Sequence, residues 1–149
     1  MNIKLFVISA VIAATSIFAN AAEPTKNDAV GLVKAAAEVV NKGGKDTLIA
    51  EVNAKSDKWT KGELYLIVLA LDGTHLAHPG NPKLIGKSLL DLGDIDLRMF
   101  RRERVRIANG PGEGWVDYKY KNPKSGIVEN KTLYVLKARD VILSAGIYK

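Results

Sequence analysis

The sequence predicts an α+β fold, in which helices cover the two faces of one antiparallel sheet. Three observations support this prediction: an amphipathic helical pattern near the N-terminus, an Asp-Gly turn between two segments rich in strand-forming residues, and three further strand-like segments toward the C-terminus. Antiparallel neighbours can be joined by short turns, so the helices are free to lie on the faces of the sheet.

An amphipathic helix is predicted from about Ala29 to the stop at Gly43-Gly44, with Thr25 or Asp28 as its cap. Its apolar side chains recur at helical spacing and form one stripe: Val30, Val33, Ala36, Ala37 and Val40. A second helical stretch follows over 46–54. The N-terminal part is therefore expected to be one long or broken helix that lies on the sheet.

Five strands are predicted. The first, 64–71, is joined by Asp72-Gly73, the dipeptide typical of a tight hairpin, to a short second strand that ends at Pro79. The other three follow late in the chain: 114–120, 130–138 and 140–148. Arg139-Asp140 is expected to form a tight reversal between the last two.

An irregular segment over 79–114 separates the second strand from the third, and a helix is predicted inside it over 94–108. An insert that is held over a sheet by both of its ends leaves a concave space beneath it. The sequence therefore predicts a helical insert over the face of the sheet that the N-terminal helix leaves free, with room for a ligand between the two.

The segment 1–21 has the layout of a secretory signal peptide: a lone Lys4, an uncharged run over 5–18, and Ala19-Asn20-Ala21 as a cleavage site. We expect cleavage after Ala21 and a periplasmic product with one domain over 22–149. The chain has 0 cysteines, which excludes disulfides, thiol catalysis and cysteine-bound metals.

The formal net charge is +6. A basic balance suits nucleic acid, anionic lipid or anionic ligands. Export argues against nucleic acid as a partner, and because the basic residues are spread along the chain, a solvated basic surface is the simpler interpretation.

The stretch HLAHPGNPKLIGKS, over 75–88, has some features of a phosphate-binding loop. That loop needs four residues between its first glycine and the Gly-Lys-Ser, whereas five separate Gly80 from Gly86. Pro82 also removes one backbone donor. Nucleotide binding is therefore not expected.

Three stretches occur in a characteristic order and spacing: LYLIVLALDGTHLAHPGNPKLIGKSLLDL, GPGEGWVDYKYKNPKSG and NKTLYVLKARDVILSAGIYK. Together they resemble the single Cache domain, the PAS-like extracellular sensor module of bacterial chemoreceptors and histidine kinases. The resemblance covers 29–149. It implies a long N-terminal helix on a five-stranded antiparallel sheet, a crossing loop at His78-Pro79 and Gly86-Lys87, and a pocket for a small organic molecule, often a short carboxylate.

A carboxylate that leaves water needs a cation or several strong donors. Lys131, which matches the lysine of the family's K-x-x-Y-V motif, is the first candidate, and a solvated lysine at a strand end is the alternative. Tyr118 and Tyr134 each offer a rigid hydroxyl. Side chains alternate along a strand, so Tyr118 and Trp115 point to opposite faces, and Tyr118 is favoured for the pocket over a core or edge tyrosine.

Trp115 is expected to be either a lid over the pocket or a core anchor. His78 is a candidate donor at the pocket mouth or a turn residue, and it is expected to point away from His75, so no metal site is predicted. Arg98, near the start of the insert, is a candidate second anion clamp. The other arginines of the insert are expected on a solvated face, with one reaching inward.

These residues favour a periplasmic binding module for a short carboxylate that acts with a separate membrane chemoreceptor or histidine kinase. The alternative is an interaction protein that binds no ligand and docks on a membrane protein or an anionic surface. An enzyme is not expected, because Ser88 and Ser144 lack an activating context. No cofactor is predicted, and a homodimer through the N-terminal helix is left open.

Overall fold

A computed structural model describes residues 22–149; the predicted signal peptide, 1–21, lies outside the described residues. Its elements in chain order are two helices, three short or medium strands, a 3-10 turn, a third helix and three long strands: α1 (Lys26–Asn41), α2 (Lys45–Asn53), β1 (Thr60–Lys61), β2 (Leu64–Ala70), β3 (His75–Ala77), η1 (Pro82–Leu84), α3 (Ile95–Asn109), β4 (Glu113–Lys121), β5 (Val128–Ala138) and β6 (Val141–Tyr148).

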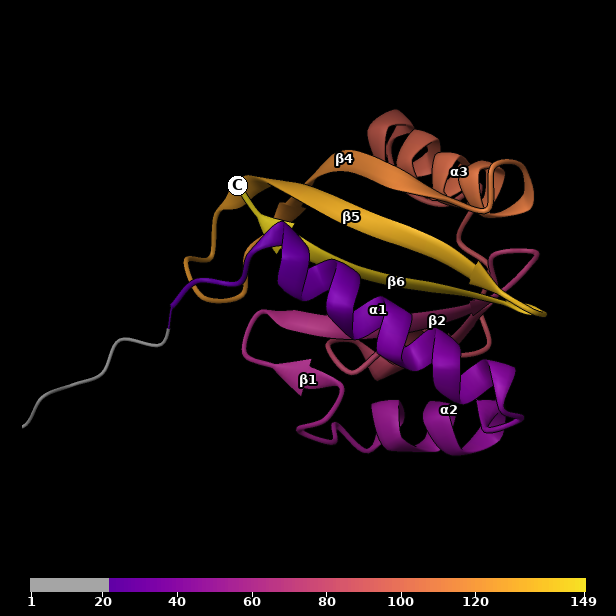
Figure 1. The fold of residues 1–149 in the computed structure, drawn as a ribbon. Helices are drawn as coiled ribbons and strands as arrows, with labels where there is room; N and C mark the ends of the chain where they lie inside the picture. Colours follow the sequence, from indigo (N-terminus) through magenta and orange to yellow (C-terminus); the bar gives the residue numbers. More distant parts are fainter. Residues whose placement is uncertain (1–21) are drawn as a thin grey trace, which may run out of the picture.

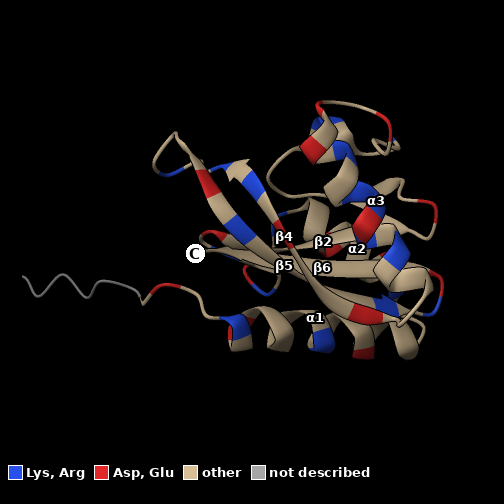
Figure 2. Ribbon diagram, turned by 90° about the horizontal axis from the view of Figure 1, so that it is seen from above, with Lys and Arg blue, Asp and Glu red and all other residues tan. Residues whose placement is uncertain are grey.

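The strands form one antiparallel sheet in the order β1-β2-β6-β5-β4, with β3 paired to β2. All five predicted strands are present, and the two-residue β1 makes the sheet six-stranded. The helix α1 lies along one face of the sheet, and α3 lies over the other (Figures 1 and 2). The predicted α+β arrangement, with the helical insert on its own face, is confirmed.

The helix α1 begins at a capping box. The Thr25 hydroxyl accepts a hydrogen bond from the Asp28 backbone N–H at 3.2 Å, and the Asp28 carboxylate accepts one from the Thr25 N–H at 2.7 Å. Both residues proposed as caps therefore contribute, because each side chain accepts a hydrogen bond from a backbone N–H that has no partner within the helix. The helix stops at Asn41, and Gly43, at φ +89°, turns the chain into α2. The N-terminal helix is thus broken rather than continuous.

The turn between β5 and β6 is the tight reversal that the sequence predicts. Ala138 pairs with Val141 across a two-residue loop. Arg139 occupies that loop at φ 53°, a left-handed conformation that most side chains avoid. The turn sets the register of the two strands, and through it the face to which each of their side chains points.

Alternation along the central strands divides the apolar side chains into two cores. Tyr134 and Leu143 pack toward α1, whereas Leu133, Val135 and Ile142 pack toward α3. Each face of the sheet is thus covered by a helix. The α3 side is the one with the predicted insert, so residues in step with Leu133 are the ones that can reach a ligand between insert and sheet.

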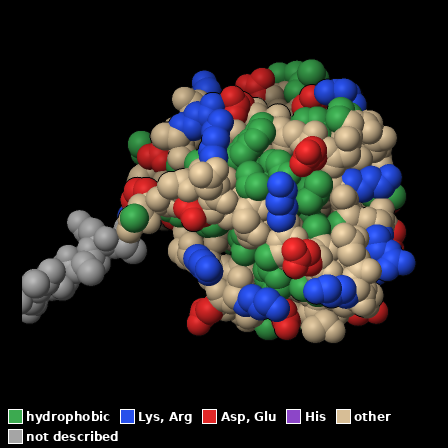
Figure 3. All heavy atoms as spheres, viewed as in Figure 1, with side chains coloured by type: hydrophobic (Ala, Val, Ile, Leu, Met, Phe, Trp, Pro, Cys, Tyr) green, Lys and Arg blue, Asp and Glu red, His purple; other side chains and the backbone are tan. Residues whose placement is uncertain are grey.

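The surface seen from the α1 side carries charges of both signs, with hydrophobic side chains between them (Figure 3). On this face the basic excess forms no continuous patch, as the interpretation of a solvated surface expects. Within 22–149, no helix is long and apolar enough to cross a membrane.

We predict that Leu143→Ala lowers the free energy of unfolding by about 2–5 kcal/mol, because it opens a cavity between α1 and the centre of the sheet. Leu143 is fully buried, at 0% exposure, whereas Leu92 is 62% exposed and supplies the same substitution as a control. Leu92→Ala is expected to change stability by less than about 0.5 kcal/mol. Urea denaturation measures both; equal losses would contradict the packing described here.

Candidate functional site

A small cavity lies between α3 and the sheet, with a volume of about 30 Å³. Its walls come from β2, the loop after β3, α3 and β4, and its polar lining residues include His75, His78, Arg101 and Arg104. A single water molecule needs roughly 10–15 Å³ by this kind of measure. The cavity is therefore nearly filled by its own side chains, and a ligand of several atoms would have to displace side chains or move α3 outward.

Arg104 is the most unusual group in this cavity. It is 3% exposed, and burial lowers the pKa of its guanidinium to about 10. The guanidinium lies 5.2 Å from the centre of the Phe100 ring, and within residues 22–149 its Nε has no hydrogen-bond partner. Among these described residues, no aspartate or glutamate lines the cavity. A buried cation without a partner is costly, so this arrangement favours an anion at the site.

Arg101 connects the cavity to the segment that precedes α3. Its Nη1 donates hydrogen bonds to the carbonyl oxygens of Leu89, at 3.2 Å, and Leu92, at 2.5 Å. Burial lowers the pKa of its guanidinium. One side chain thus both faces the cavity and fixes the backbone of the loop that closes it.

His75 and His78 also face the cavity, with ring centroids 6.0 Å apart. The expectation that they point to opposite faces is wrong, because β3 ends at Ala77 and the alternation of a strand does not extend to His78. The Nδ1 of His75 lies 3.2 Å from the Lys87 carbonyl oxygen, and the Nδ1 of His78 accepts a hydrogen bond from the Asn81 N–H at 3.0 Å.

Both imidazoles are neutral at pH 7. Burial lowers the pKa of His75 to about 4, with a further contribution from Arg104. Burial also lowers the pKa of His78 to about 4, followed by the effects of His75, Arg104 and Lys131. A neutral His78 whose Nδ1 accepts a hydrogen bond carries its proton on Nε2, so that nitrogen remains a donor. Within 22–149, no cluster of three or more histidine, aspartate or glutamate side chains could hold a metal ion.

Lys131 is buried beside the same cavity and is not a solvated lysine at a strand end. It is 2% exposed, and its Nζ lies 4.6 Å, 5.0 Å and 5.9 Å from the ring centres of Tyr148, Tyr65 and Tyr120. Burial lowers the pKa of the amine to about 8, against the opposite effect of Glu63.

Gly146 leaves room for the Lys131 side chain. A Cβ at Gly146 would lie 3.1 Å from Lys131 Cε.

Tyr118 lies on the α3 face of the sheet, the face that the alternation argument favours. Its ring stacks on Phe100, with centroids 3.8 Å apart and planes 4° from parallel. Burial raises the pKa of its hydroxyl above the ordinary value. Tyr118 and His78 therefore line the same cavity, and Lys131 lies near Tyr65 and Tyr120, two other residues that line it.

Trp115 and Tyr134 are not brought to this cavity. Both pack on the α1 side of the sheet, with ring centroids 5.3 Å apart. The Tyr134 hydroxyl donates a hydrogen bond to Glu113 at 2.5 Å, and Lys26 lies 4.9 Å from the Trp115 ring centre. Of the two alternatives for Trp115, the structure shows packing against a core. Alternation gives the reason, since a strand that turns Tyr118 toward α3 turns Trp115 away.

Arg98 also lies outside the lining of the cavity, whose arginines are Arg101 and Arg104. A signal for these two was present in the sequence. Four residues of this helix recur at the spacing of one stripe: Leu97, Arg101, Arg104 and Ala108. A helix that turns the apolar Leu97 and Ala108 toward the sheet therefore turns both arginines toward it as well.

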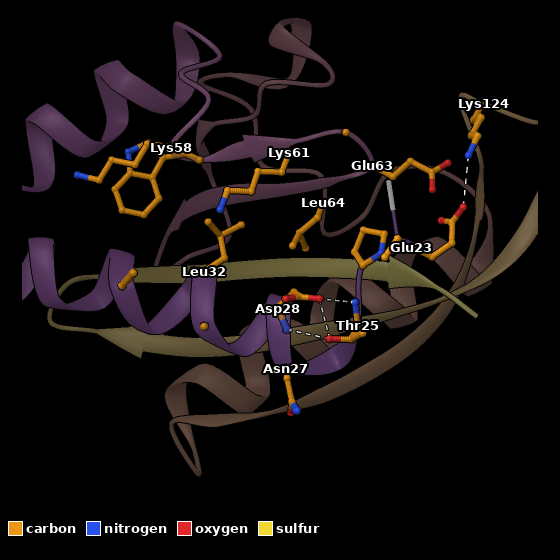
Figure 4. A pocket seen from close by; sticks show the side chains of 16 residues that line it. Glu23, Thr25, Asn27, Asp28, Leu32, Lys58, Lys61, Glu63, Leu64 and Lys124 are labelled. Atoms are coloured by element: carbon orange, nitrogen blue, oxygen red, sulfur yellow. Dashed lines mark hydrogen bonds and ion pairs between the residues drawn. The ribbon is translucent and has the colours of Figure 1, made fainter. Parts of the chain in front are cut away.

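A larger groove lies elsewhere, between the first turns of α1 and the β1–β2 hairpin, with a volume of about 1080 Å³ (Figure 4). Its charged side chains are of both signs, and Lys124 pairs there with Glu23 at 3.4 Å. The groove lies open at the surface and holds no buried, unpaired cation. The smaller cavity under α3 is therefore the candidate site.

We predict that Arg101→Ala speeds amide hydrogen exchange in the segment 89–92, because the two carbonyl oxygens lose their shared donor. Arg102→Ala is the matched control, since Arg102 is exposed and pairs with the exposed Asp91. Exchange measured by mass spectrometry should rise in the first variant and stay near wild type in the second. Unchanged exchange in Arg101→Ala would show that the side chain does not fix the loop.

A second prediction concerns acid stability. Each histidine has a folded-state pKa of about 4 against an ordinary value of 6.5, so between these values the unfolded chain binds more protons than the folded one. The free energy of unfolding should therefore be full above pH 6.5 and fall as the pH is lowered toward 4. Urea denaturation at several pH values tests this, and the double variant His75→Gln and His78→Gln should show a flatter profile in that window. An equal slope in the double variant would refute the assignment.

Comparisons with known proteins identify this fold. The family model for single Cache domain 2 matches residues 21–149. The periplasmic sensor domain of a chemotaxis protein is similar to this chain, with a TM-score of 0.63 and 25% identity over 82% of this chain and 88% of that one. A search of curated proteins found no match.

Two further solved structures share the fold. One is described as the structural basis for carboxylic acid recognition by a Cache chemosensory domain, with a TM-score of 0.59 and 24% identity over 78% of each chain. The other is a methyl-accepting chemotaxis protein from Vibrio parahaemolyticus RIMD 2210633, with a TM-score of 0.58 and 22% identity over 80% of each chain. Because the family model spans the whole described part, the chain belongs to the single Cache domain 2 family, a family of sensory ligand-binding domains.

Proposed function

We propose that this protein is a periplasmic sensor-type domain that binds a short organic carboxylate under α3. The observation that carries the proposal is Arg104, a buried cation whose Nε has no partner in a cavity without acidic lining residues. A carboxylate would supply the missing acceptor and the missing charge together. The guanidinium fork would also fix the orientation of that carboxylate.

The size and the walls of the cavity favour an acid of two or three carbons. The volume of about 30 Å³ leaves little space, and much of the lining is apolar: Ile67, Leu84, Leu89, Leu97 and Phe100. A short alkyl group suits such walls because it needs no polar partner. Acetate and propionate are therefore the first ligands to test.

The other polar groups have proposed roles beside Arg104. Lys131 adds a second positive charge next to the cavity. His78 offers its Nε2–H as a neutral donor, and Tyr118 with Phe100 forms a stacked aromatic wall. Arg101 can turn from the loop carbonyls toward the ligand. None of these roles requires bond breaking, so the proposal is binding rather than catalysis.

A membrane chemoreceptor or histidine kinase is the proposed partner that reads the occupied state. The similar periplasmic sensor domain of a chemotaxis protein supports this class of partner. A homodimer through α1 is not part of the proposal, because the outward side chains of that helix include the exposed and charged Lys34 and Glu38.

One observation favours the second candidate, an interaction protein that binds no ligand. Leu92, Ile95 and Met99, beside the cavity, are 62%, 61% and 60% exposed. Exposed apolar side chains that lie close together mark contact surfaces in many proteins. Under this alternative, acetate and propionate would leave the melting temperature of the protein unchanged.

We predict that Arg104→Met weakens propionate binding by about 10- to 100-fold, since a charge-assisted hydrogen bond contributes roughly 1.5–3 kcal/mol. Arg106→Met is the control, because Arg106 lies on the exposed side of α3 and pairs with Glu103. Isothermal titration calorimetry compares both variants with wild type. Equal affinities in all three proteins would overturn the assignment of the site to Arg104.

A further inference from the structure

We propose that Lys131 forms a reversible imine with the carbonyl carbon of an α-keto acid whose carboxylate is held by Arg104. This inference rests on the proposed function and deepens it, because it names a class of ligand that can react with the site. Carboxylate binding alone does not require a lysine enclosed by tyrosine rings, whereas imine formation gives that enclosure a function.

The surroundings of Lys131 are those of a nucleophilic lysine. A surface lysine is hydrated and protonated, which makes its amine a poor nucleophile, whereas a desolvated lysine is a stronger one. Lys131 is almost fully buried, and its Nζ lies near the rings of three tyrosines. Burial already brings its pKa down to about 8.

Two tyrosine rings lie between the amine's surroundings and the carboxylate site. The rings of Tyr65 and Tyr120 line the cavity, and the same rings lie 5.0 Å and 5.9 Å from Lys131 Nζ. The positive charges of Lys131 and Arg104 both lower the pKa of His78. The reaction requires a carbonyl carbon close to the carboxylate, and in an α-keto acid these two carbons are directly bonded.

The groups that face the amine come from three strands and one turn. Tyr65 belongs to β2, Tyr120 to β4 and Tyr148 to β6, while Glu63 in the turn before β2 acts on the lysine as a negative charge. Aromatic faces attract cations. A protonated imine is a cation, as the ammonium is, so the rings that hold the free lysine also hold the adduct.

The reaction is balanced without an oxidant or another reactant. The neutral amine attacks the keto carbon and forms a carbon–nitrogen bond, and the carbonyl oxygen leaves as water. Counted from the ammonium form, one ammonium and one carbonyl give one protonated imine and one water. Hydrolysis reverses the step, so occupancy of the site follows the concentration of the keto acid.

The test uses pyruvate as the keto acid and sodium borohydride to trap the imine in the purified protein. Reduction should leave an adduct on Lys131 whose added mass is that of pyruvic acid less one oxygen atom, located by peptide mass spectrometry. Propionate in excess should prevent labelling, because it occupies Arg104 but has no carbonyl. Lys131→Arg should abolish the adduct. Lys58→Arg is the matched control, since Lys58 lies 4.7 Å from the Trp59 ring centre but is exposed.

The outcomes separate this inference from the proposed function. If pyruvate raises the melting temperature but leaves no adduct, the imine is overturned and carboxylate binding stands. An adduct spread over the exposed lysines, or one that propionate does not prevent, also overturns it. If neither pyruvate nor propionate stabilises the protein, the proposed function fails as well. Circular dichroism checks that Lys131→Arg is folded, and the competition by propionate in wild type does not depend on that variant.

Discussion

The central constraint in this structure is the burial of the Arg104 guanidinium on the inner side of α3 without a carboxylate beside it. A charge inside a protein is tolerated when it is paired or hydrogen-bonded, and the cavity supplies neither for Nε. Lys131 is buried on the same side of the sheet, within a ring of tyrosines. Under the proposed function, a bound carboxylate supplies the acceptor that Arg104 Nε lacks.

The two faces of the sheet differ in the side chains that they carry. Side chains on the α1 face, such as Tyr134 and Leu143, form a continuous apolar core that supports the fold. The α3 face combines an apolar part around Leu133 with the cavity that holds Arg104. The proposed ligand site and the apolar core under α1 therefore lie on opposite faces of the sheet. Arg101 joins the cavity to the loop 89–92 through its hydrogen bonds to Leu89 and Leu92.

Much of the fold could be predicted because its signals are local. Thr25 caps a helix, Asp72-Gly73 turns a hairpin, and Arg139-Asp140 joins the last two strands. Local patterns also selected Tyr118 and His78, which line the cavity, and Lys131, which is buried on the same side of the sheet. Alternation alone does not say which strand face meets α3, because that depends on long-range packing. Trp115 and Tyr134 were therefore candidates from the sequence, although they pack on the α1 side.

The most direct test of the central claim observes the Nε–H of Arg104 itself. In ¹⁵N-labelled protein, the Nε–H resonance of Arg104, assigned with Arg104→Lys, can be followed by nuclear magnetic resonance while propionate is added. The account predicts a saturable shift of that resonance, because the donor gains a carboxylate acceptor, while the exposed Arg106 resonance stays in place. An Arg104 resonance that does not move while the ligand demonstrably binds would contradict the account.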